Sequence, residues 1–121
     1  MVRILIVEDN VSFRQSLKTI LRLRFPSIVI DEAAERNEAL KKVDTFFPDL
    51  IFMDINLPVE NGLFLTQKVK KDHPEIIICI LTSCDLPQYR EAALQCGASC
   101  FITKDSLIWK EIEALIQAIT N

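Results

Sequence analysis

Short apolar segments recur along the chain and alternate with longer segments in which apolar residues return at helical spacing. The four clearest apolar runs span residues 4–7, 28–30, 50–53 and 76–81, and a weaker fifth spans residues 100–102. Several of these runs are apolar at every position, which is typical of strands buried on both faces of a parallel sheet. The pattern therefore predicts five strands separated by helices.

The segments between the runs carry apolar stripes with a helical period. The clearest stripe lies near the C-terminus and predicts a helix over about residues 106–120. In chain order the stripes are Phe13, Leu17, Ile20 and Leu21; Leu40, Val43 and Phe47; Leu65 and Val69; Tyr89, Ala92, Ala93 and Cys96; and Ile108, Ile112, Leu115, Ile116 and Ile119. All five prolines fall between the periodic segments, where they mark the ends of helices.

Strands that alternate with helices imply right-handed crossovers and a doubly wound parallel sheet. In a chain of 121 residues, five such strands suit an α/β fold of the flavodoxin-like type, with strand order 2-1-3-4-5 and five helices. No linker, repeat or low-complexity segment interrupts the pattern. We therefore expect residues 1–121 to form one domain, with no output domain in this chain.

Composition and charge narrow the range of functions. The chain has 14 basic and 17 acidic residues, and the net charge of −3 argues against direct nucleic-acid binding by this domain. Because the chain has only two glycines, it lacks the glycine-rich loops of dinucleotide and nucleotide sites. No apolar run is long enough to span a membrane and no signal peptide is recognisable, so the sequence predicts a cytoplasmic protein.

The four cysteines, Cys79, Cys84, Cys96 and Cys100, form no C-x-x-C pair, and His73 is the one histidine. A zinc site is therefore not expected, and a cytosolic location disfavours disulfides. Cys79 and Cys100 are interpreted as small core residues. His73 precedes a proline and is interpreted as a solvated loop residue.

Polar residues gather at the carboxyl ends of the predicted strands. Glu8 and Asp9 follow the first strand, Asp54 the third, Thr82 the fourth and Lys104 the fifth. In open α/β sheets the ligand lies beyond this edge, at the point where the strand order reverses. Three crowded carboxylates repel one another, and a hard divalent cation such as Mg²⁺ removes that conflict. A lysine and a hydroxyl beside the acids suit phosphoryl transfer with a carboxylate as nucleophile.

Four segments of the chain match a known family. They are I-L-I-V-E-D-N at residues 4–10, D-L-I-F-M-D-I-N-L-P at residues 49–58 with N-G at 61–62, I-L-T-S at residues 80–83, and G-A-S-C-F-I-T-K at residues 97–104. In this order and at these spacings they make the whole chain similar to the receiver domain of two-component response regulators. The run K-D-S at residues 104–106 resembles the subgroup that is joined to LuxR/NarL-type helix-turn-helix domains.

The resemblance implies a phosphate acceptor and a metal site. Asp54 corresponds to the aspartate that accepts the phosphoryl group. The implied Mg²⁺ site consists of Asp9 as a direct ligand, Asp54, the backbone carbonyl of Asn56, and Glu8 acting through water. By the same resemblance, the domain is a switch that assists its own phosphorylation and dephosphorylation, and is not an enzyme acting on other substrates.

The resemblance also implies a conformational switch. Thr82 and Lys104 correspond to the hydroxyl and the lysine that contact the phosphoryl oxygens. Phe101 corresponds to the aromatic residue that turns inward when Thr82 moves toward the phosphate. The implied phosphodonor is a phosphohistidine on a sensor histidine kinase or a phosphotransfer protein, and a homodimer formed on phosphorylation is a further expectation.

Several alternatives remain open at this point. A phosphatase of the haloacid dehalogenase type would need a second aspartate two positions after the nucleophile, where this chain has Asn56. A flavin or nucleotide module would need a glycine- or hydroxyl-rich loop at residues 10–12. A pseudo-receiver would bind partners without phosphorylation. The domain is either a stand-alone receiver or the N-terminal part of a longer regulator, and the K-D-S run favours a regulator with a C-terminal DNA-binding domain.

Overall fold

A five-stranded parallel sheet forms the centre of the molecule in the computed structural model, which describes residues 1–58, 61–106 and 109–120. In spatial order the strands are β2 (Val29–Ala33), β1 (Arg3–Val7), β3 (Leu50–Met53), β4 (Ile77–Thr82) and β5 (Cys100–Thr103). Each neighbouring pair is parallel. The predicted strand order 2-1-3-4-5 is therefore confirmed.

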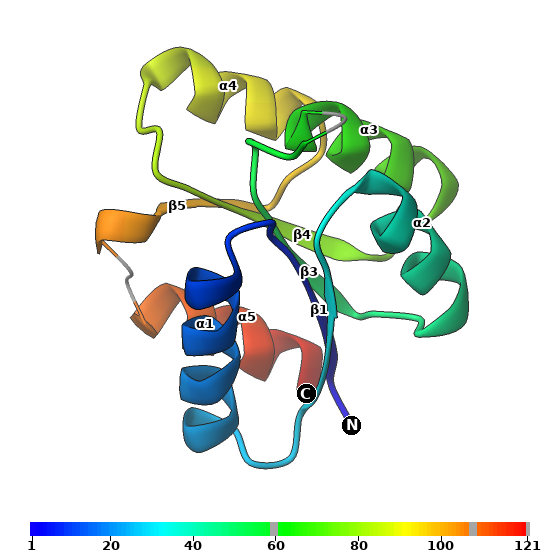
Figure 1. The fold of residues 1–121 in the computed structure, drawn as a ribbon, viewed down its shortest axis with the longest axis vertical. Helices are drawn as coiled ribbons and strands as arrows, with labels where there is room; N and C mark the ends of the chain where they lie inside the picture. Colours follow the sequence, from blue (N-terminus) through cyan, green and yellow to red (C-terminus); the bar gives the residue numbers. More distant parts are fainter. Residues whose placement is uncertain (59–60, 107–108, 121) are drawn as a thin grey trace.

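Helices cover both faces of the sheet (Figure 1). They are α1 (Val11–Arg24), α2 (Arg36–Thr45), α3 (Gly62–Asp72), α4 (Pro87–Gln95) and α5 (Trp109–Thr120), with a 3-10 turn at Lys104–Ser106. Helices α1 and α5 lie on one face, and α2, α3 and α4 lie on the other (Figure 1). This is the doubly wound α/β arrangement with five helices that the apolar pattern predicts.

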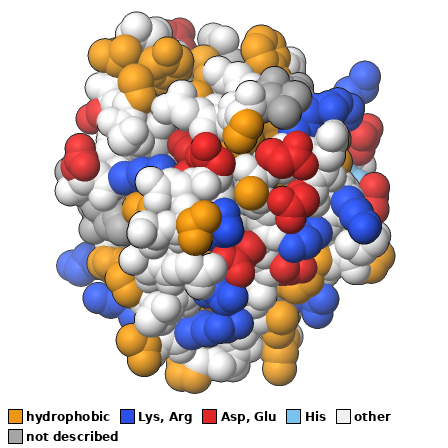
Figure 2. Space-filling view, viewed as in Figure 1, with side chains coloured by type: hydrophobic (Ala, Val, Ile, Leu, Met, Phe, Trp, Pro, Cys, Tyr) orange, Lys and Arg blue, Asp and Glu red, His pale blue; other side chains and the backbone are white. Residues whose placement is uncertain are grey.

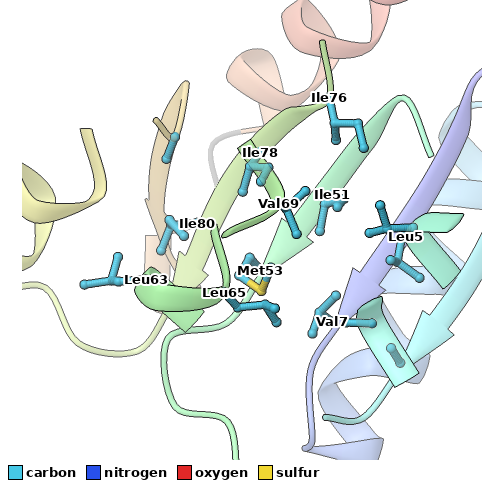
Figure 3. Packing of buried hydrophobic residues seen from close by; sticks show 14 of the residues in the cluster. Leu5, Val7, Ile51, Met53, Leu63, Leu65, Val69, Ile76, Ile78 and Ile80 are labelled. Atoms are coloured by element: carbon cyan, nitrogen blue, oxygen red, sulfur yellow. The ribbon is translucent and has the colours of Figure 1, made fainter. Parts of the chain in front are cut away.

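The sheet separates two apolar cores, because successive side chains of a strand point to opposite faces. On β1, Leu5 and Val7 pack with residues of α2, α3 and α4, whereas Ile4 and Ile6 pack with residues of α1 and α5. Figure 3 shows the first of these cores, with strand side chains meeting those of α3. Burial on both faces explains why the central strands are apolar at every position except Arg3 at the start of β1 and Thr82 at the end of β4.

Strand β2 is the exception, because it lies at an edge of the sheet. The apolar run at residues 28–30 predicts only its first part, and the strand continues through Asp31 and Glu32 to Ala33. Glu32 pairs with Arg14 at 3.0 Å and with Lys18 at 2.8 Å. An edge strand that is only half-buried tolerates such charged positions, and charges also discourage edge-to-edge association.

Two predicted helix stripes are each wrong at one position, because Ile20 on α1 is exposed and Phe47 lies beyond α2. Helix α2 stops at Thr45, so Phe47 is not part of it and is exposed, with a φ of 55°. Phe46 is buried in its place, with the guanidinium of Arg3 4.4 Å from its ring centroid. The stripe of the last helix is confirmed from Ile112 onward, whereas Ile108 lies outside the described residues.

Two single-residue interpretations also need correction. Cys79 is a buried core residue as expected, but Cys100 is only partly buried. His73 is not simply solvated, because its Nε2 lies 3.3 Å from Asp44 and its Nδ1 lies 3.5 Å from Glu75. It ends α3, where its backbone N–H donates to the carbonyl of Val69.

The outer surface is mixed in character. Figure 2 shows acidic and basic side chains interleaved across the middle of one face, with hydrophobic side chains gathered over α4. Leu86 and Leu94, at the two ends of that helix, are among the exposed large apolar residues. Within the described ranges, no helix is both long and apolar enough to cross a membrane.

Candidate phosphoryl-acceptor site

Three carboxylates meet at the carboxyl edge of the sheet. Glu8 and Asp9 follow β1, and Asp54 follows β3, the strand beside it. One carboxylate oxygen from each of the three lies within 4.8 Å of the others. Glu8 and Asp54 are 2% and 4% exposed, whereas Asp9 is exposed, so the cluster is open to solvent on one side. The structure thus brings together the three acids that the sequence placed at this edge.

Asp54 has an unfavourable environment for a charge. Burial, followed by the nearby charge of Glu8, raises the pKa of Asp54 to about 7, although Lys104 and the backbone N–H of Asn56 act against this rise. Its Oδ1 is one of two buried side-chain oxygens in the described part of the chain that lack a hydrogen-bond partner. A buried acceptor oxygen without a donor is free to take an electrophile or a cation.

The backbone beneath Asp54 is closely packed. A Cβ at Gly62, the first residue of α3, would lie 1.9 Å from the carbonyl oxygen of Asp54. The amide of Gly62 also donates to the carbonyl of Ile55 at 2.7 Å. Only glycine lets α3 begin this close to the strand end, and the contact fixes where Asp54 lies.

Lys104 supplies the positive charge of the site. Its ammonium group pairs with the Glu8 carboxylate and lies 3.6 Å from Oδ2 of Asp54. It also lies 4.5 Å from the ring centroid of Phe13, which follows the start of α1. The lysine is therefore held between two carboxylates and an aromatic face, mostly shielded from solvent.

Glu8 is itself fixed by the start of α1. Its Oε2 accepts a hydrogen bond from the backbone N–H of Asn10 at 3.0 Å, and its carbonyl accepts one from Arg14 at 2.7 Å. Asn10 caps the helix, since its Oδ1 accepts from the N–H of Phe13 at 3.0 Å. The helix cap and the acidic cluster are therefore parts of one arrangement.

The two residues expected to act as a switch lie on β4 and β5. Thr82 is fully buried, and its Oγ1 accepts a hydrogen bond from the backbone N–H of Cys84 at 3.3 Å. Phe101 is buried at 9% exposure, and the guanidinium of Arg90 lies 4.8 Å from its ring centroid. Arg90 also pairs with Asp85 at 3.0 Å. The arginine thus connects the segment after Thr82 with the ring of Phe101.

The donor set fits a hard divalent cation. It consists of carboxylate oxygens, of which Asp54 Oδ1 is unpartnered, together with the exposed segment at Asn56, whose carbonyl is the fourth expected ligand. Mg²⁺ prefers one or two carboxylates and keeps several waters, which the open side at Asp9 permits. The cluster can therefore hold a cation beside a nucleophilic carboxylate.

Sequence reasoning missed several residues of this site. Phe13 was assigned only to an apolar helix stripe, and Arg14 and Arg90 were not identified because an arginine on a helix has no distinctive spacing. The sequence did point to Gly62, since this residue is one of only two glycines and lies in the segment after the third strand. The pairing of Lys104 with Glu8 depends on side-chain conformations, which no sequence pattern contains.

Comparison with known proteins shows the family of the chain. Residues 4–119 match the family described as response regulator receiver domain. The transcriptional regulatory protein DegU of Brevibacillus brevis is 30% identical over 118 residues, which cover 98% of this chain and 48% of DegU. A protein-glutamate methylesterase/protein-glutamine glutaminase of Geobacillus kaustophilus is 31% identical over 106 residues, or 87% of this chain and 30% of that protein. The chain spans about half the length of the curated relatives that it matches first.

Solved structures give the same result. A two-component response regulator of the LuxR family from Aurantimonas sp. is 26% identical, with a TM-score of 0.87 over 98% of this chain and 84% of that one. A response regulator from Thermotoga maritima in complex with Mg²⁺ and BeF is 29% identical, with a TM-score of 0.83 over 98% and 99% of the two chains. The LuxR-family neighbour agrees with the resemblance seen at residues 104–106.

Proposed function

The chain belongs to the response regulator receiver domains of two-component signalling, and from this premise we propose that Asp54 is its phosphate acceptor. The observation that carries the proposal is the buried Asp54 carboxylate, whose Oδ1 lacks a hydrogen-bond partner beside Glu8 and Lys104. Receiver domains act in general as switches and not as enzymes. Here the chain's own residues promote the reaction on Asp54.

The proposed reaction is an in-line phosphoryl transfer. An oxygen of ionised Asp54 attacks the phosphorus of a phosphohistidine on a sensor histidine kinase or phosphotransfer protein. The new P–O bond replaces the P–N bond, and the imidazole leaves. Such transfers depend mainly on positioning and on charge neutralisation, so the surrounding residues determine the rate.

Glu8, Asp9, Asp54 and the carbonyl of Asn56 are the proposed ligands of Mg²⁺, which when bound neutralises charge on the transferring phosphoryl oxygens. Lys104 remains within reach of the same oxygens, because its ammonium lies 3.6 Å from Oδ2 of Asp54. The salt bridge to Glu8 holds this ammonium in place before the phosphoryl group arrives. Asp9, which is exposed, keeps the solvent side of the site acidic.

Phosphorylation would then alter β4 and β5. The phosphoryl group adds about −1.5 to −2 charges near the buried hydroxyl of Thr82. The hydroxyl of Thr82 can donate a hydrogen bond to a phosphoryl oxygen, and this draws the segment after β4 toward Asp54. Arg90 links that segment to Phe101, so movement of Thr82 changes the packing of the aromatic ring. A bistable element of α4, β5 and α5 is the proposed output surface.

The whole protein is proposed to be a transcription regulator. The chain spans about half of the regulators it matches, and a LuxR-family response regulator is among its structural neighbours. We place a DNA-binding domain after this receiver, with a homodimer formed on phosphorylation. A cytoplasmic location belongs to the same proposal, because the phosphodonor has to reach Asp54.

The test is phosphorylation by a small acyl phosphate with Mg²⁺, followed by intact-mass measurement. We expect the wild type to gain one phosphoryl group, and Asp54→Asn to gain none. Asp105→Asn is the matched control, since Asp105 is an exposed aspartate next to Lys104, and it should react like the wild type. An unmodified wild type would instead indicate a pseudo-receiver. A modified Asp54→Asn variant would show that another residue accepts the phosphoryl group.

A further inference from the structure

Two cysteines lie side by side in the sheet, away from the acidic cluster. Cys79 on β4 and Cys100 on β5 are direct partners in the parallel register of these strands. Neighbouring strands lie about 4.7–4.9 Å apart, which is within the range of about 4.4–6.8 Å between the Cα atoms of disulfides. Residues in direct register point to the same face, and both side chains belong to the core under α1 and α5.

The two thiols differ in exposure. Cys79 is fully buried, whereas Cys100 is partly exposed on the edge strand. The thiol of Cys100 donates a hydrogen bond to Oε2 of Glu111 on α5, with 3.9 Å between Sγ and Oε2. The Cys100 thiol is therefore accessible to a small reagent, whereas the buried Cys79 thiol is shielded from one.

The contact between the thiols also makes them chemically unequal. A hydrogen bond from Cys79 is the main cause that lowers the pKa of Cys100, against burial and the charge of Glu111. The same hydrogen bond, together with burial, raises the pKa of Cys79 well above its usual range. The thiolate is the reactive form of a cysteine, so Cys100 is the one that reacts first.

We propose that Cys100 and Cys79 form a redox-modification site, in which a peroxide oxidises Cys100 and Cys79 resolves it to a disulfide across β4 and β5. Cys100 first releases its proton to solvent, its thiolate attacks a peroxide oxygen, the O–O bond breaks, and the departing hydroxide or alkoxide takes up the released proton as water or alcohol. Cys100 becomes a sulfenic acid, and the peroxide is reduced by two electrons. The Cys79 sulfur then attacks the Cys100 sulfur, the S–O bond breaks, and water leaves with the Cys79 proton.

The bond would act on the switch elements and not on the acceptor itself. It closes the chain between residues 79 and 100, a loop that contains Thr82 and all of α4. It also fixes β4 to β5, whose carboxyl ends carry Thr82 and Lys104. Oxidation therefore restricts the relative movement of these two strands. Because Cys100 is partly exposed on the edge strand, the bond belongs to the exposed disulfides that are typically reducible and regulatory.

The experiment exposes the folded chain to hydrogen peroxide, quenches it with a thiol-alkylating reagent, and maps the peptides. The Cys84→Ser/Cys96→Ser double variant leaves only the proposed pair of the four free cysteines. We expect both remaining thiols to be lost together, an intramolecular peptide link between residues 79 and 100, and full recovery with a dithiol reductant. The thermal midpoint, followed by Trp109 fluorescence, should rise on oxidation, because the cross-link restricts the unfolded chain.

Two further variants define the order of events. Cys79→Ala should leave Cys100 as a sulfenic acid that a dimedone-type reagent traps, whereas Cys100→Ser should leave Cys79 reduced at the same peroxide concentration. The proposal is overturned if the double variant keeps two alkylatable thiols, forms only intermolecular links, or carries Cys100 to the sulfinic acid without a disulfide. The double variant keeps both Cys79 and Cys100. These results therefore do not depend on whether Cys79→Ala folds.

Discussion

The ammonium group of Lys104 lies 3.6 Å from Oδ2 of Asp54, and its closer partner is the carboxylate of Glu8. Lys104 therefore forms its closer ion pair with Glu8 and remains within reach of the acceptor Asp54. A phosphoryl group on Asp54 would compete with Glu8 for the same ammonium group. The same ammonium group therefore pairs with Glu8 before phosphorylation and with the phosphoryl group afterwards.

Lys104→Gln should slow phosphorylation of Asp54 by about 10²-fold, since it removes one preorganised charge from the transferring group. The measurement is the initial rate of phosphoryl gain from an acyl phosphate at saturating Mg²⁺. Lys110→Gln, at an exposed position on α5, is the matched control and should keep the wild-type rate. Equal rates for the two variants would remove Lys104 from the proposed mechanism.

Asp54→Asn should stabilise the metal-free protein by about 1–3 kcal/mol at pH 8. The native wild type has to keep an ionised carboxylate buried beside Glu8, and the amide removes that cost. Urea unfolding in a chelator, followed by Trp109 fluorescence, measures the difference. Mg²⁺ should raise the stability of the wild type by more than that of the variant. A variant less stable than the wild type in the chelator would contradict this account of the acidic cluster.

Gly62→Ala should destabilise the fold by about 2–4 kcal/mol, because its Cβ would lie 1.9 Å from the backbone carbonyl of Asp54. Gly97→Ala provides the comparison. Gly97 has a φ of +102°, but its nearest neighbour is the flexible side chain of Lys70 at 3.1 Å, so we expect a smaller loss of about 1–2 kcal/mol. Urea titration of the two variants measures their free energies of unfolding and shows which substitution destabilises the fold more. A loss at Gly62 below that at Gly97 would show that the start of α3 can move.

Glu32→Gln should weaken the dependence of stability on pH in acid. Burial alone would raise the pKa of Glu32, but hydrogen bonds from Lys18 and Arg14 hold it below its usual range. A carboxylate with a lowered native pKa contributes stability above its unfolded value, about 4.3, and loses it as pH falls through the native value. We expect a loss of about 0.5–1 kcal/mol at pH 7 that disappears below pH 4. Glu91→Gln, at an exposed site on α4, controls for the change in net charge.

Periodicity was sufficient to predict the sheet, because burial on both faces leaves β3 apolar throughout and β1 and β4 apolar except at one end residue each, Arg3 and Thr82. It failed where burial is incomplete. At the edge strand β2, ion pairs replace apolar contacts, so only its first residues are recognisable as a strand. It failed again at Phe47, which has a positive φ, because the helix ends at Thr45, two residues before the apolar pattern does.

The site divides in a similar way. Glu8, Asp9, Asp54, Thr82 and Lys104 could be predicted because each lies at the carboxyl end of a strand or within two residues after it, and parallel strands bring these ends to one edge. The residues that hold them could not. The positions of Arg14 on Glu8, of Phe13 under Lys104 and of Arg90 over Phe101 depend on helix packing and side-chain conformation.

The central claim is that Asp54 itself carries the phosphoryl group, and the most direct test locates the modification. Hydride reduction of the phosphorylated protein converts an aspartyl phosphate into homoserine, which peptide mass mapping assigns to one position. We predict homoserine at position 54 alone, and only when Mg²⁺ and the phosphodonor are both present. Conversion at position 8 or 9, or a phosphoryl gain that hydride leaves unchanged, would contradict the account.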